Sequence, residues 1–250
     1  MSIENPFSLS NKIVVVTGAS SGIGRCIAIE ASKFGAKLIL IGRDENRLQE
    51  VCSCLIGGEH RFFCCDITDE GMVDQFLKEC PSIDGLVHSA GIGLTLPFKF
   101  TTQRELNRIM EVNFQAPVLL TQKLIKQKKI KNGGSIVYMS SIDGVVTGHV
   151  GNSIYSASKG ALVGMAKSQA VELAMRNIRV NCILPARVET PLIKRDNISE
   201  EQITKNKELY PLKRYARPEE IAYYAIYLLS NASSFTTGSN LVIDGGFTLL

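Results

Sequence analysis

The sequence predicts an α/β fold: a single doubly wound, seven-stranded parallel sheet with helices on both faces. Short β-branched runs alternate with helical stretches along the chain, which implies right-handed strand–helix–strand crossovers. The first run, residues 12–17, is apolar on both of its pleat faces, as expected of a strand covered on both sides. A glycine-rich turn at residues 18–24 follows that strand directly and opens a helical stretch, which is the setting of a dinucleotide-binding turn.

Seven short apolar runs predict the strands of the sheet. They are residues 12–17, 37–41, 60–65, 85–89, 135–140, 179–184 and 240–243. Longer stretches predict helices at residues 22–34, 46–55, 69–80, 102–129, 155–175 and 218–229. We expect Pro117 to interrupt or kink the fourth of these helices, because proline lacks the N–H that a helix interior needs.

Residues 187–217 differ from the rest of the chain. This stretch is charged, poor in strand signal and rich in proline, and long insertions of this kind usually form a lid or a binding loop. A plain surface excursion is the alternative. No linker divides the chain, so we expect one dinucleotide-binding domain over residues 1–250, with residues 187–217 as its substrate lid.

Composition narrows the classes of partner. Hydrophobic residues make up 45% of the chain and charged residues 21%, which suits a globular protein, and a net charge of +4 is too mild to indicate nucleic acid or an anionic membrane. No apolar run is long enough to span a bilayer, and the polar N-terminus lacks the apolar core of a signal peptide. We therefore expect a cytoplasmic location.

The chain contains 7 cysteines and 3 histidines. The odd cysteine count and the absence of a CxxC pair predict reduced, mostly buried thiols. The histidines supply no zinc-like spacing beside the cysteine pairs, so we expect no metal site.

The glycine turn has the spacing G-x-x-x-G-x-G. Glycines allow the backbone to turn tightly and to approach a pyrophosphate, whose charge is then met by a helix N-terminus. The residues that we expect to line a cofactor here are Gly18, Ser20, Ser21, Gly22, Ile23 and Gly24.

The end of the second strand decides between the two nicotinamide cofactors. A carboxylate there would bind a free ribose hydroxyl, whereas an arginine suits a 2′-phosphate. The sequence reads Gly42-Arg43-Asp44, which favours NADP through Arg43 over NAD. Asp44 could instead take the ribose, or it could cap the following helix, and a capping role is compatible with Arg43 holding the phosphate.

Two further strand ends lie at the edge where such sheets bind ligands. Asp66, followed by Ile67, could hydrogen-bond an adenine amino group, although Asp66 or Thr68 could equally cap the next helix. Ser89, Ala90 and Gly91 are small enough to let a ribose lie close to the backbone; a simple turn is the alternative.

Tyr155 and Lys159 lie four residues apart at the start of a predicted helix and would therefore share one face. A nearby ammonium favours a phenolate, so the pair could transfer a proton near neutral pH; a solvated pair is the alternative. Ser141 ends the fifth strand and could donate to a substrate carbonyl. His149 has no evident carboxylate partner in the sequence, so Ser141 is not expected to be a nucleophile.

Asn113 is unfavourable inside a predicted helix, which indicates either a local kink or a polar group that faces water.

With these motifs together, residues 9–247 resemble a classical short-chain dehydrogenase/reductase, closest in appearance to the 3-oxoacyl-acyl-carrier-protein reductases. The motifs are the residue 17–24 turn, Asn113, Ser141, the residue 155–159 YSASK segment and the residue 244–246 ending. The resemblance implies a Rossmann fold and NADP-dependent hydride transfer between a nicotinamide and a carbonyl or hydroxyl compound, with a 3-oxoacyl thioester, bound to acyl-carrier protein, as one candidate.

The resemblance also implies the roles of individual residues. Tyr155 would be the general acid in reduction, and Lys159 would lower its pKa and bind the nicotinamide ribose. Ser141 would hold the substrate oxygen, and Asn113 would hold a water of a proton relay. Pro185, Val188 and Thr190 would meet the nicotinamide end of the cofactor. Homotetramers or homodimers, packed through residues 102–129 and 155–175, are common in this family.

The chain departs from the family pattern at three places. Ser89 replaces the usual asparagine, and Ala186 replaces the usual glycine after Pro185, but neither change removes a catalytic group. Arg187 brings a charge close to the expected nicotinamide site, where it could favour an anionic substrate or face solvent. Two rival functions remain: an NAD-linked sugar, polyol or steroid dehydrogenase, and a non-catalytic cofactor-binding sensor.

Overall fold

The computed structural model describes residues 5–191 and 199–250. Residues 192–198 of the expected lid lie outside the described residues. Seven parallel strands form one sheet in the order β3-β2-β1-β4-β5-β6-β7. The strands are β1 Ile13–Thr17, β2 Lys37–Gly42, β3 Arg61–Cys64, β4 Ile83–His88, β5 Ile130–Met139, β6 Arg179–Pro185 and β7 Asn240–Ile243. The prediction of a doubly wound, Rossmann-type parallel sheet is confirmed.

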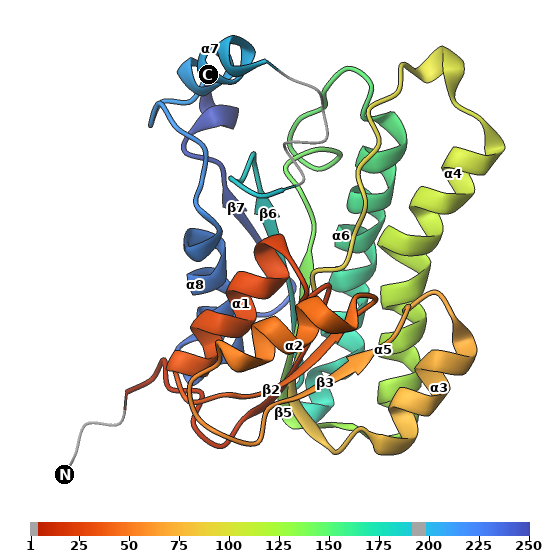
Figure 1. The fold of residues 1–250 in the computed structure, drawn as a ribbon, viewed down its shortest axis with the longest axis vertical. Helices are drawn as coiled ribbons and strands as arrows, with labels where there is room; N and C mark the ends of the chain where they lie inside the picture. The colour runs from red at the N-terminus through yellow and green to blue at the C-terminus, as the bar shows by residue number, and fades with distance from the viewer. Residues whose placement is uncertain (1–4, 192–198) are drawn as a thin grey trace.

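Helices cover both faces of this sheet (Figure 1). The helices are α1 Gly22–Lys33, α2 Glu45–Ser53, α3 Glu70–Glu79, α4 Gln103–Met110, α5 Ala116–Lys126, α6 Ser153–Leu173, α7 Glu200–Glu208 and α8 Pro218–Leu229. Shorter helical turns are η1 Phe98–Phe100, η2 Glu111–Gln115, η3 Ala174–Arg176, η5 Asn231–Ser233 and η6 Phe247–Leu249. Residues of α1, α2 and α8 share one buried core with the sheet, and residues of α3, α5 and α6 share the core on the other face.

The strand order places a crevice at the carboxyl edge of the sheet. β1 lies between β2 and β4, so the chain leaves β1 toward one face and leaves β4 toward the other. Ligands of open α/β sheets bind where the strand order reverses in this way. The turn after β1 and the loop after β4 therefore open into the same space.

The helix predicted over residues 102–129 is three helices in series. α4 is followed by the π-helix η2, and α5 begins at Ala116 with Pro117 in its first turn. Pro117 has no N–H to offer the carbonyl of Asn113, four residues earlier, so a regular α-helix cannot continue through this point. The predicted interruption near Pro117 is confirmed. It takes the form of a wider π-helical turn, and Asn113 lies inside this turn.

Two other features differ from the sequence prediction. β5 begins five residues earlier than expected, at Ile130. Residues 187–217, the expected lid, contain α7, a helix that was not predicted from the sequence. Its signal is a capping box: the Ser199 side chain accepts from the backbone of Gln202, and the Gln202 side chain accepts from the backbone of Ser199. The Ser-x-x-Gln spacing of residues 199–202 could have identified this helix.

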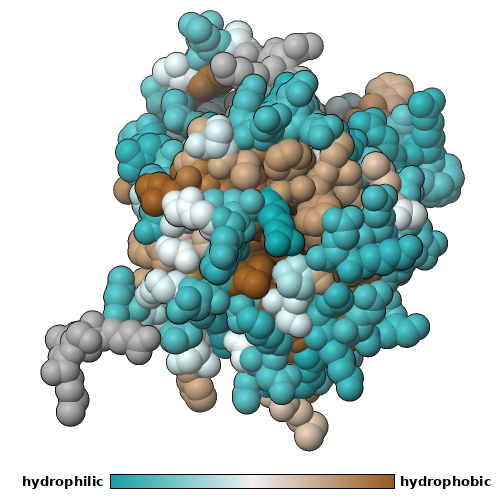
Figure 2. Space-filling model, turned by 60° about the horizontal axis from the view of Figure 1, so that its bottom comes forward, coloured by the Kyte–Doolittle hydropathy of each residue, from teal (hydrophilic) through white to brown (hydrophobic). Residues whose placement is uncertain are grey.

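On the face drawn in Figure 2, apolar residues gather toward the middle and hydrophilic residues surround them. Within residues 5–191 and 199–250, no helix is both long enough and apolar enough to cross a membrane. Of the cysteines, Cys26, Cys65, Cys80 and Cys182 are buried, and all seven are free thiols.

Candidate active site

The start of α6 is fastened to the end of β5. The Ser140 hydroxyl donates to the carbonyl of Lys159 at 2.8 Å, and the Lys159 ammonium donates to the carbonyl of Met139 at 2.8 Å. Gly144 completes the contact, because a Cβ atom at this position would lie 2.0 Å from the Ser156 carbonyl oxygen. These contacts bring the strand end that carries Ser141 and the helix turn that carries Tyr155 to one place.

Tyr155, Ser141 and Lys159 form a compact group there. Ser141 is buried, its side chain hydrogen-bonds Tyr155, and its oxygen accepts the backbone N–H of Asp143 at 3.1 Å. The Lys159 ammonium lies 5.7 Å from the centre of the Tyr155 ring. Lys159 itself is buried, so the alternative of a solvated lysine on a helix surface is wrong.

The protonation of the pair differs from the sequence expectation. Burial raises the pKa of Tyr155 to about 12, and the nearby Asp143 carboxylate adds to the rise, although the hydrogen bond with Ser141 opposes it. Burial also lowers the pKa of Lys159 to about 8. Burial therefore outweighs any lowering of the Tyr155 pKa by Lys159, and the role expected of Lys159 stays a prediction.

Asn113 lies in η2 and connects two other parts of the site. Its Oδ1 accepts the backbone N–H of Ile92 at 2.8 Å, and its Nδ2 donates to the Ile92 carbonyl at 2.9 Å and to the Ser158 hydroxyl at 3.1 Å. Both amide hydrogens are therefore engaged. Any water that Asn113 holds would have to donate to its side-chain oxygen or its main-chain oxygen. A Cβ atom on Gly91 would lie 3.3 Å from Asn113 Oδ1 and 3.4 Å from Lys159 Nζ, so these two side chains flank Gly91.

The glycine turn after β1 is packed as a cofactor cradle requires. Gly18 has φ +66°, and a Cβ atom there would lie 2.7 Å from the backbone of Ala90. A Cβ atom on Gly24 would lie 2.5 Å from the Gly18 carbonyl. The turn and the loop after β4 therefore touch. Thr17 joins them as well, because its hydroxyl accepts the backbone N–H of Ser89 at 3.2 Å.

The N-terminus of α1 is open to a ligand of negative charge. Ser21 is its N-cap residue, but no side chain caps the helix there and no acidic residue lies in its first turn. Gly22 has φ +55°, and a Cβ atom there would lie 3.6 Å from the Thr190 side chain. Ser20, in the turn after β1, lies against Gly42 at the end of β2. Ile23 packs against the core. These residues fit a pyrophosphate-binding turn.

The structure at the end of β2 shows which groups Asp44 contacts and how exposed Arg43 is. Asp44 caps α2, since its Oδ1 accepts the backbone N–H of Arg47 at 3.0 Å, and its other oxygen lies 3.2 Å from Arg47 Nε. Both carboxylate oxygens of Asp44 are thus engaged by Arg47. The Arg43 side chain is 70% exposed, and its guanidinium lies 3.8 Å from an Asp66 oxygen at the end of β3. Exposed and beside the crevice, Arg43 is available to a phosphate.

Asp66 does not cap α3, and neither does Thr68. The N-cap residue is Asp69, whose Oδ1 accepts the backbone N–H of Met72 at 2.9 Å. Asp66 instead accepts from Thr68, through the backbone N–H at 3.0 Å and the hydroxyl at 2.8 Å. The capping alternative is therefore wrong, because the chain makes a turn at residues 66–69 before the helix begins. Ile67 packs on the core beneath this turn.

The segment after β6 pairs with Ala216, so the two ends of the expected lid lie side by side. Val188 is buried and bridges Ala216, the Glu189 N–H donates to the Ala216 carbonyl at 2.9 Å, and the Ala216 N–H donates to the Arg187 carbonyl at 3.1 Å. Pro185 accepts the backbone N–H of Ile142 at 3.1 Å, which ties this segment to the loop after Ser141. The two ends of the lid are therefore held together at the edge of the site.

Sequence reasoning missed one cluster beside Ser141. His149 has a carboxylate partner after all: its Nδ1 lies 2.5 Å from Oδ1 of the buried Asp143. Asn152 Nδ2 donates to the other Asp143 oxygen at 2.8 Å. The six-residue separation crosses a loop that turns at the left-handed Gly144, so no periodic spacing pointed to the contact.

Comparison with known proteins agrees with this geometry. The family described as enoyl-(acyl carrier protein) reductase matches residues 18–248. A 3-oxoacyl-[acyl-carrier-protein] reductase of Rickettsia prowazekii is 32% identical over 243 residues, covering 97% of this chain and 99% of the relative. An NAD-dependent glycerol dehydrogenase of Listeria innocua is 34% identical over 255 residues, covering 98% of this chain and 97% of the relative.

A crystal structure of a short-chain type dehydrogenase/reductase from Mycobacterium marinum matches with a TM-score of 0.88 and 34% identity, covering 98% of each chain. The similarity extends over the glycine turn, the Tyr155–Lys159 helix and the last strand alike, since both sequence relatives and the solved structure span nearly the whole chain. This chain therefore belongs to the short-chain dehydrogenase/reductase family of oxidoreductases.

Proposed function

We propose that the protein is an NADP-dependent reductase of carbonyl compounds, with Tyr155 as the general acid. The observation that carries the proposal is the group formed by Tyr155, Ser141 and Lys159, at the sheet edge where the glycine turn also opens. The bound cofactor would supply the hydride. The chain itself would supply the proton, the hydrogen bond to the substrate oxygen and the binding site for the cofactor.

The proton comes from Tyr155. Because its pKa is raised to about 12, the phenol keeps its proton throughout the neutral range, as a donor to a carbonyl oxygen must. Ser141 hydrogen-bonds the same phenol and would orient the substrate oxygen beside it. The Lys159 ammonium favours the phenolate left after the proton has moved.

Several parts of the described chain would hold the cofactor. The turn after β1 and the loop after β4 would hold the phosphates and the riboses, with Lys159 at the nicotinamide ribose and Val188 and Thr190 at the nicotinamide end. Arg43 supports NADP, because its guanidinium is exposed at the end of β2 while Asp44 is engaged in capping α2. A Cβ atom at Gly42 would lie 3.2 Å from Leu48 and 3.3 Å from Ser20, which leaves little room for the carboxylate that an NAD site would place there.

A second candidate is an NAD-linked polyol dehydrogenase. The glycerol dehydrogenase relative, whose name states NAD dependence, favours it. The 3-oxoacyl-[acyl-carrier-protein] reductase relative favours a 3-oxoacyl thioester as substrate instead. We further propose that the whole chain acts as one domain with a lid over residues 187–217, in the cytoplasm, as a homotetramer or homodimer. A non-catalytic sensor is disfavoured, because it would have no need of Asn113, Ser141, Tyr155 and Lys159 together.

The test is to mix the purified protein with NADPH or NADH and a panel of ketones and to follow the loss of reduced-cofactor absorbance. Tyr155→Phe, which removes only the hydroxyl, should lower kcat by at least ~100-fold, the usual contribution of a general acid. Tyr224→Phe, on the outer side of α8, is the matched control and should retain wild-type activity. Full turnover by Tyr155→Phe would show that the proton comes from elsewhere.

A further inference from the structure

The Asp143–His149 pair is a fixed polar unit in the loop after Ser141. Asp143 is buried, and both of its carboxylate oxygens accept hydrogen bonds, one from His149 Nδ1 and one from Asn152 Nδ2. An ionised carboxylate only accepts, so the His149 Nδ1 must carry a proton. The tautomer of the imidazole is thereby set, and Nε2 is the nitrogen left for another partner.

This unit lies next to the reacting groups. The backbone N–H of Asp143 donates to Ser141 Oγ at 3.1 Å, and the Asp143 carboxylate is close enough to affect the Tyr155 phenol. The loop cannot drift from α6, because Gly144 packs against the Ser156 carbonyl. Asp143 therefore joins the residue that would hold the substrate oxygen to the imidazole that lies farther out along the same loop.

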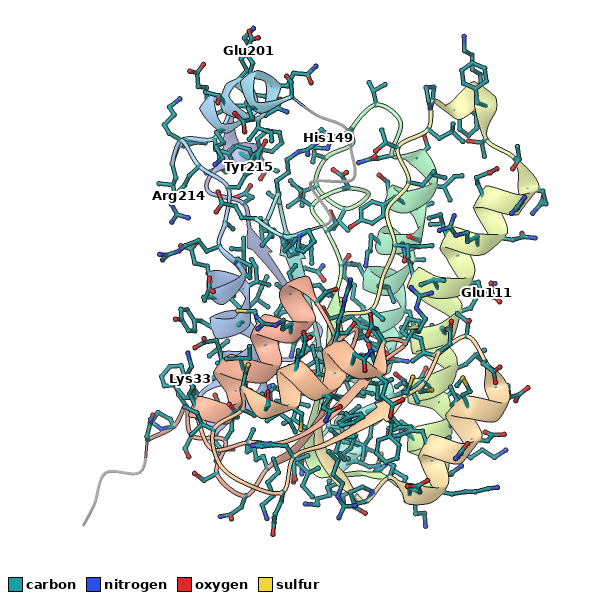
Figure 3. The ribbon with its side chains drawn as sticks, viewed as in Figure 1. Lys33, Glu111, His149, Glu201, Arg214 and Tyr215 are labelled. Atoms are coloured by element: carbon teal, nitrogen blue, oxygen red, sulfur yellow. The ribbon has the colours of Figure 1, made fainter. Side chains whose placement is uncertain are left out.

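The imidazole is also held on its flat side. Its ring stacks on Phe247 at 5.6 Å between ring centres and an angle of 24°, and Phe247 in turn lies 4.9 Å from Tyr210 of the lid. The His149 side chain nevertheless stays 41% exposed. Figure 3 shows it between the segment that carries Tyr215 and the loop above α6. The ring is held in place by a carboxylate and by a stacking partner, and its Nε2 can bind a polar group of a ligand.

We propose that His149 is a specificity-determining residue whose Nε2 binds a hydroxyl group on the substrate carbon next to the reacting carbonyl. The inference rests on the proposed function and names its substrate class: hydroxyketones, and the vicinal diols formed from them. A hydroxyl suits Nε2 in either state of the ring, because it donates to the neutral imidazole and accepts from the protonated one. The second oxygen of a 3-oxoacyl thioester is a carbonyl, which can only accept, so it pairs with the protonated ring alone.

The first test compares 1-hydroxypropan-2-one with butan-2-one, which differ by a hydroxyl in place of a methyl group. The wild type should prefer the hydroxyketone in kcat/KM. His149→Phe keeps a ring that can stack on Phe247 but removes both nitrogens, and it should reduce that preference ~10- to 100-fold, the range of a lost hydrogen bond to a polarised group. Val150→Ala, at the neighbouring 94% exposed position, should leave the preference unchanged. An equal preference in wild type and His149→Phe would overturn the proposal.

The second test does not depend on turnover. The chain has only 3 histidines, so their ring protons can be resolved by NMR, and the resonance missing in His149→Phe identifies His149. In the presence of NADP⁺, which has no hydride to transfer to a ketone, 1-hydroxypropan-2-one should shift this resonance, and butan-2-one should not. Failure of the wild type to reduce any ketone would refute the proposed function, whereas an unmoved His149 resonance, or a larger shift with acetoacetyl-N-acetylcysteamine, would refute this inference by itself.

Discussion

At the scale of single residues, burial governs the two ionisable groups of the candidate site. Tyr155 keeps its proton because desolvation penalises the phenolate, and Lys159 loses its proton more readily because desolvation penalises the ammonium. The same physical cause thus acts in opposite directions on an acid and on a base. Each residue is shifted toward its neutral form, and the neutral phenol is the form that can donate.

The pH dependence of carbonyl reduction should report Lys159. With its pKa near 8, the side chain is charged below pH 8 and neutral above it, so the cation that stabilises the nascent phenolate is lost as the pH rises. We expect kcat/KM to fall above about pH 8, approaching tenfold per pH unit. Lys159→Arg, whose guanidinium remains charged, should be slower at pH 7 but should lack this descending limb. An identical limb in both proteins would assign it to another group.

At the scale of elements, the π-helix η2 explains how an asparagine within a helical stretch reaches the site. The widened turn lets the Asn113 amide face inward, where it holds both backbone groups of Ile92 and the Ser158 hydroxyl. Ser158 precedes Lys159, and Ile92 follows Gly91. Asn113 therefore sets the distance between the loop after β4 and the catalytic face of α6.

Asn113→Leu should destabilise the protein and lower its activity together. The change keeps the number and branching of the side-chain heavy atoms but leaves the Ile92 N–H and carbonyl without their side-chain partner, which should lower the free energy of unfolding by about 2–3 kcal/mol. Urea titration measures this loss. Asn107→Leu, on the exposed side of α4, is the control and should change stability by less than about 0.5 kcal/mol. Wild-type stability in Asn113→Leu would mean that the loop holds its place without the amide.

A second element-scale feature is the buried network between β4, β5 and α5. His88 is stacked on Tyr138 at 4.9 Å, and its Nε2 lies 2.7 Å from the Thr121 hydroxyl. The Tyr138 hydroxyl lies 3.0 Å from the same Thr121 oxygen. His88 Nδ1 is buried without a hydrogen-bond partner. Burial lowers the pKa of His88 to about 3, so the ring is neutral in the folded protein.

The stability of the protein should therefore fall in mild acid. In the unfolded chain His88 has a pKa near 6.5, and in the folded protein its pKa is about 3, so only the unfolded state binds a proton between these values. The stabilisation is complete above pH 6.5 and is lost as the pH decreases toward 3, at about 1.4 kcal/mol per pH unit. Urea titrations of wild type and His88→Gln between pH 7 and pH 5 should diverge by this slope. Parallel curves would show that His88 is not buried as a neutral ring.

At the scale of the whole molecule, the arrangement of the sheet was predictable because it follows from the alternation of strands and helices along the sequence. Strands that are apolar on both faces and separated by helices can only form a covered parallel sheet, whose carboxyl ends then share one edge. That logic alone brings Gly18 against Ala90, and Gly22 against Thr190, although the members of each pair are about 70 and 170 residues apart. The meeting of Ser141 with Tyr155 follows in the same way.

Features that depend on loop paths and on burial were not predictable. The contact between Asp143 and His149 spans a loop that turns at the left-handed Gly144, and such turns leave no periodic pattern. The pKa of Tyr155 depends on how deeply the phenol is buried, which the four-residue spacing to Lys159 does not reveal. Spacing shows which groups can meet, but only the surrounding packing determines their charge.

The cofactor should stabilise the entire fold, because its expected contacts come from the turns after β1, β2 and β4, from α6 and from the segment after β6. At 100 times its Kd, a ligand adds about 2.7 kcal/mol, which for a chain of this size raises Tm by about 5–10 °C. NADPH should raise Tm more than NADH at equal concentration, because only NADPH offers a phosphate to Arg43. Arg43→Ala should remove this difference, whereas Arg47→Ala, whose partner is Asp44 on the surface of α2, should preserve it. A difference that survives in Arg43→Ala would place the 2′-phosphate contact elsewhere, and a larger shift with NADH in the wild type would favour the NAD-linked polyol dehydrogenase.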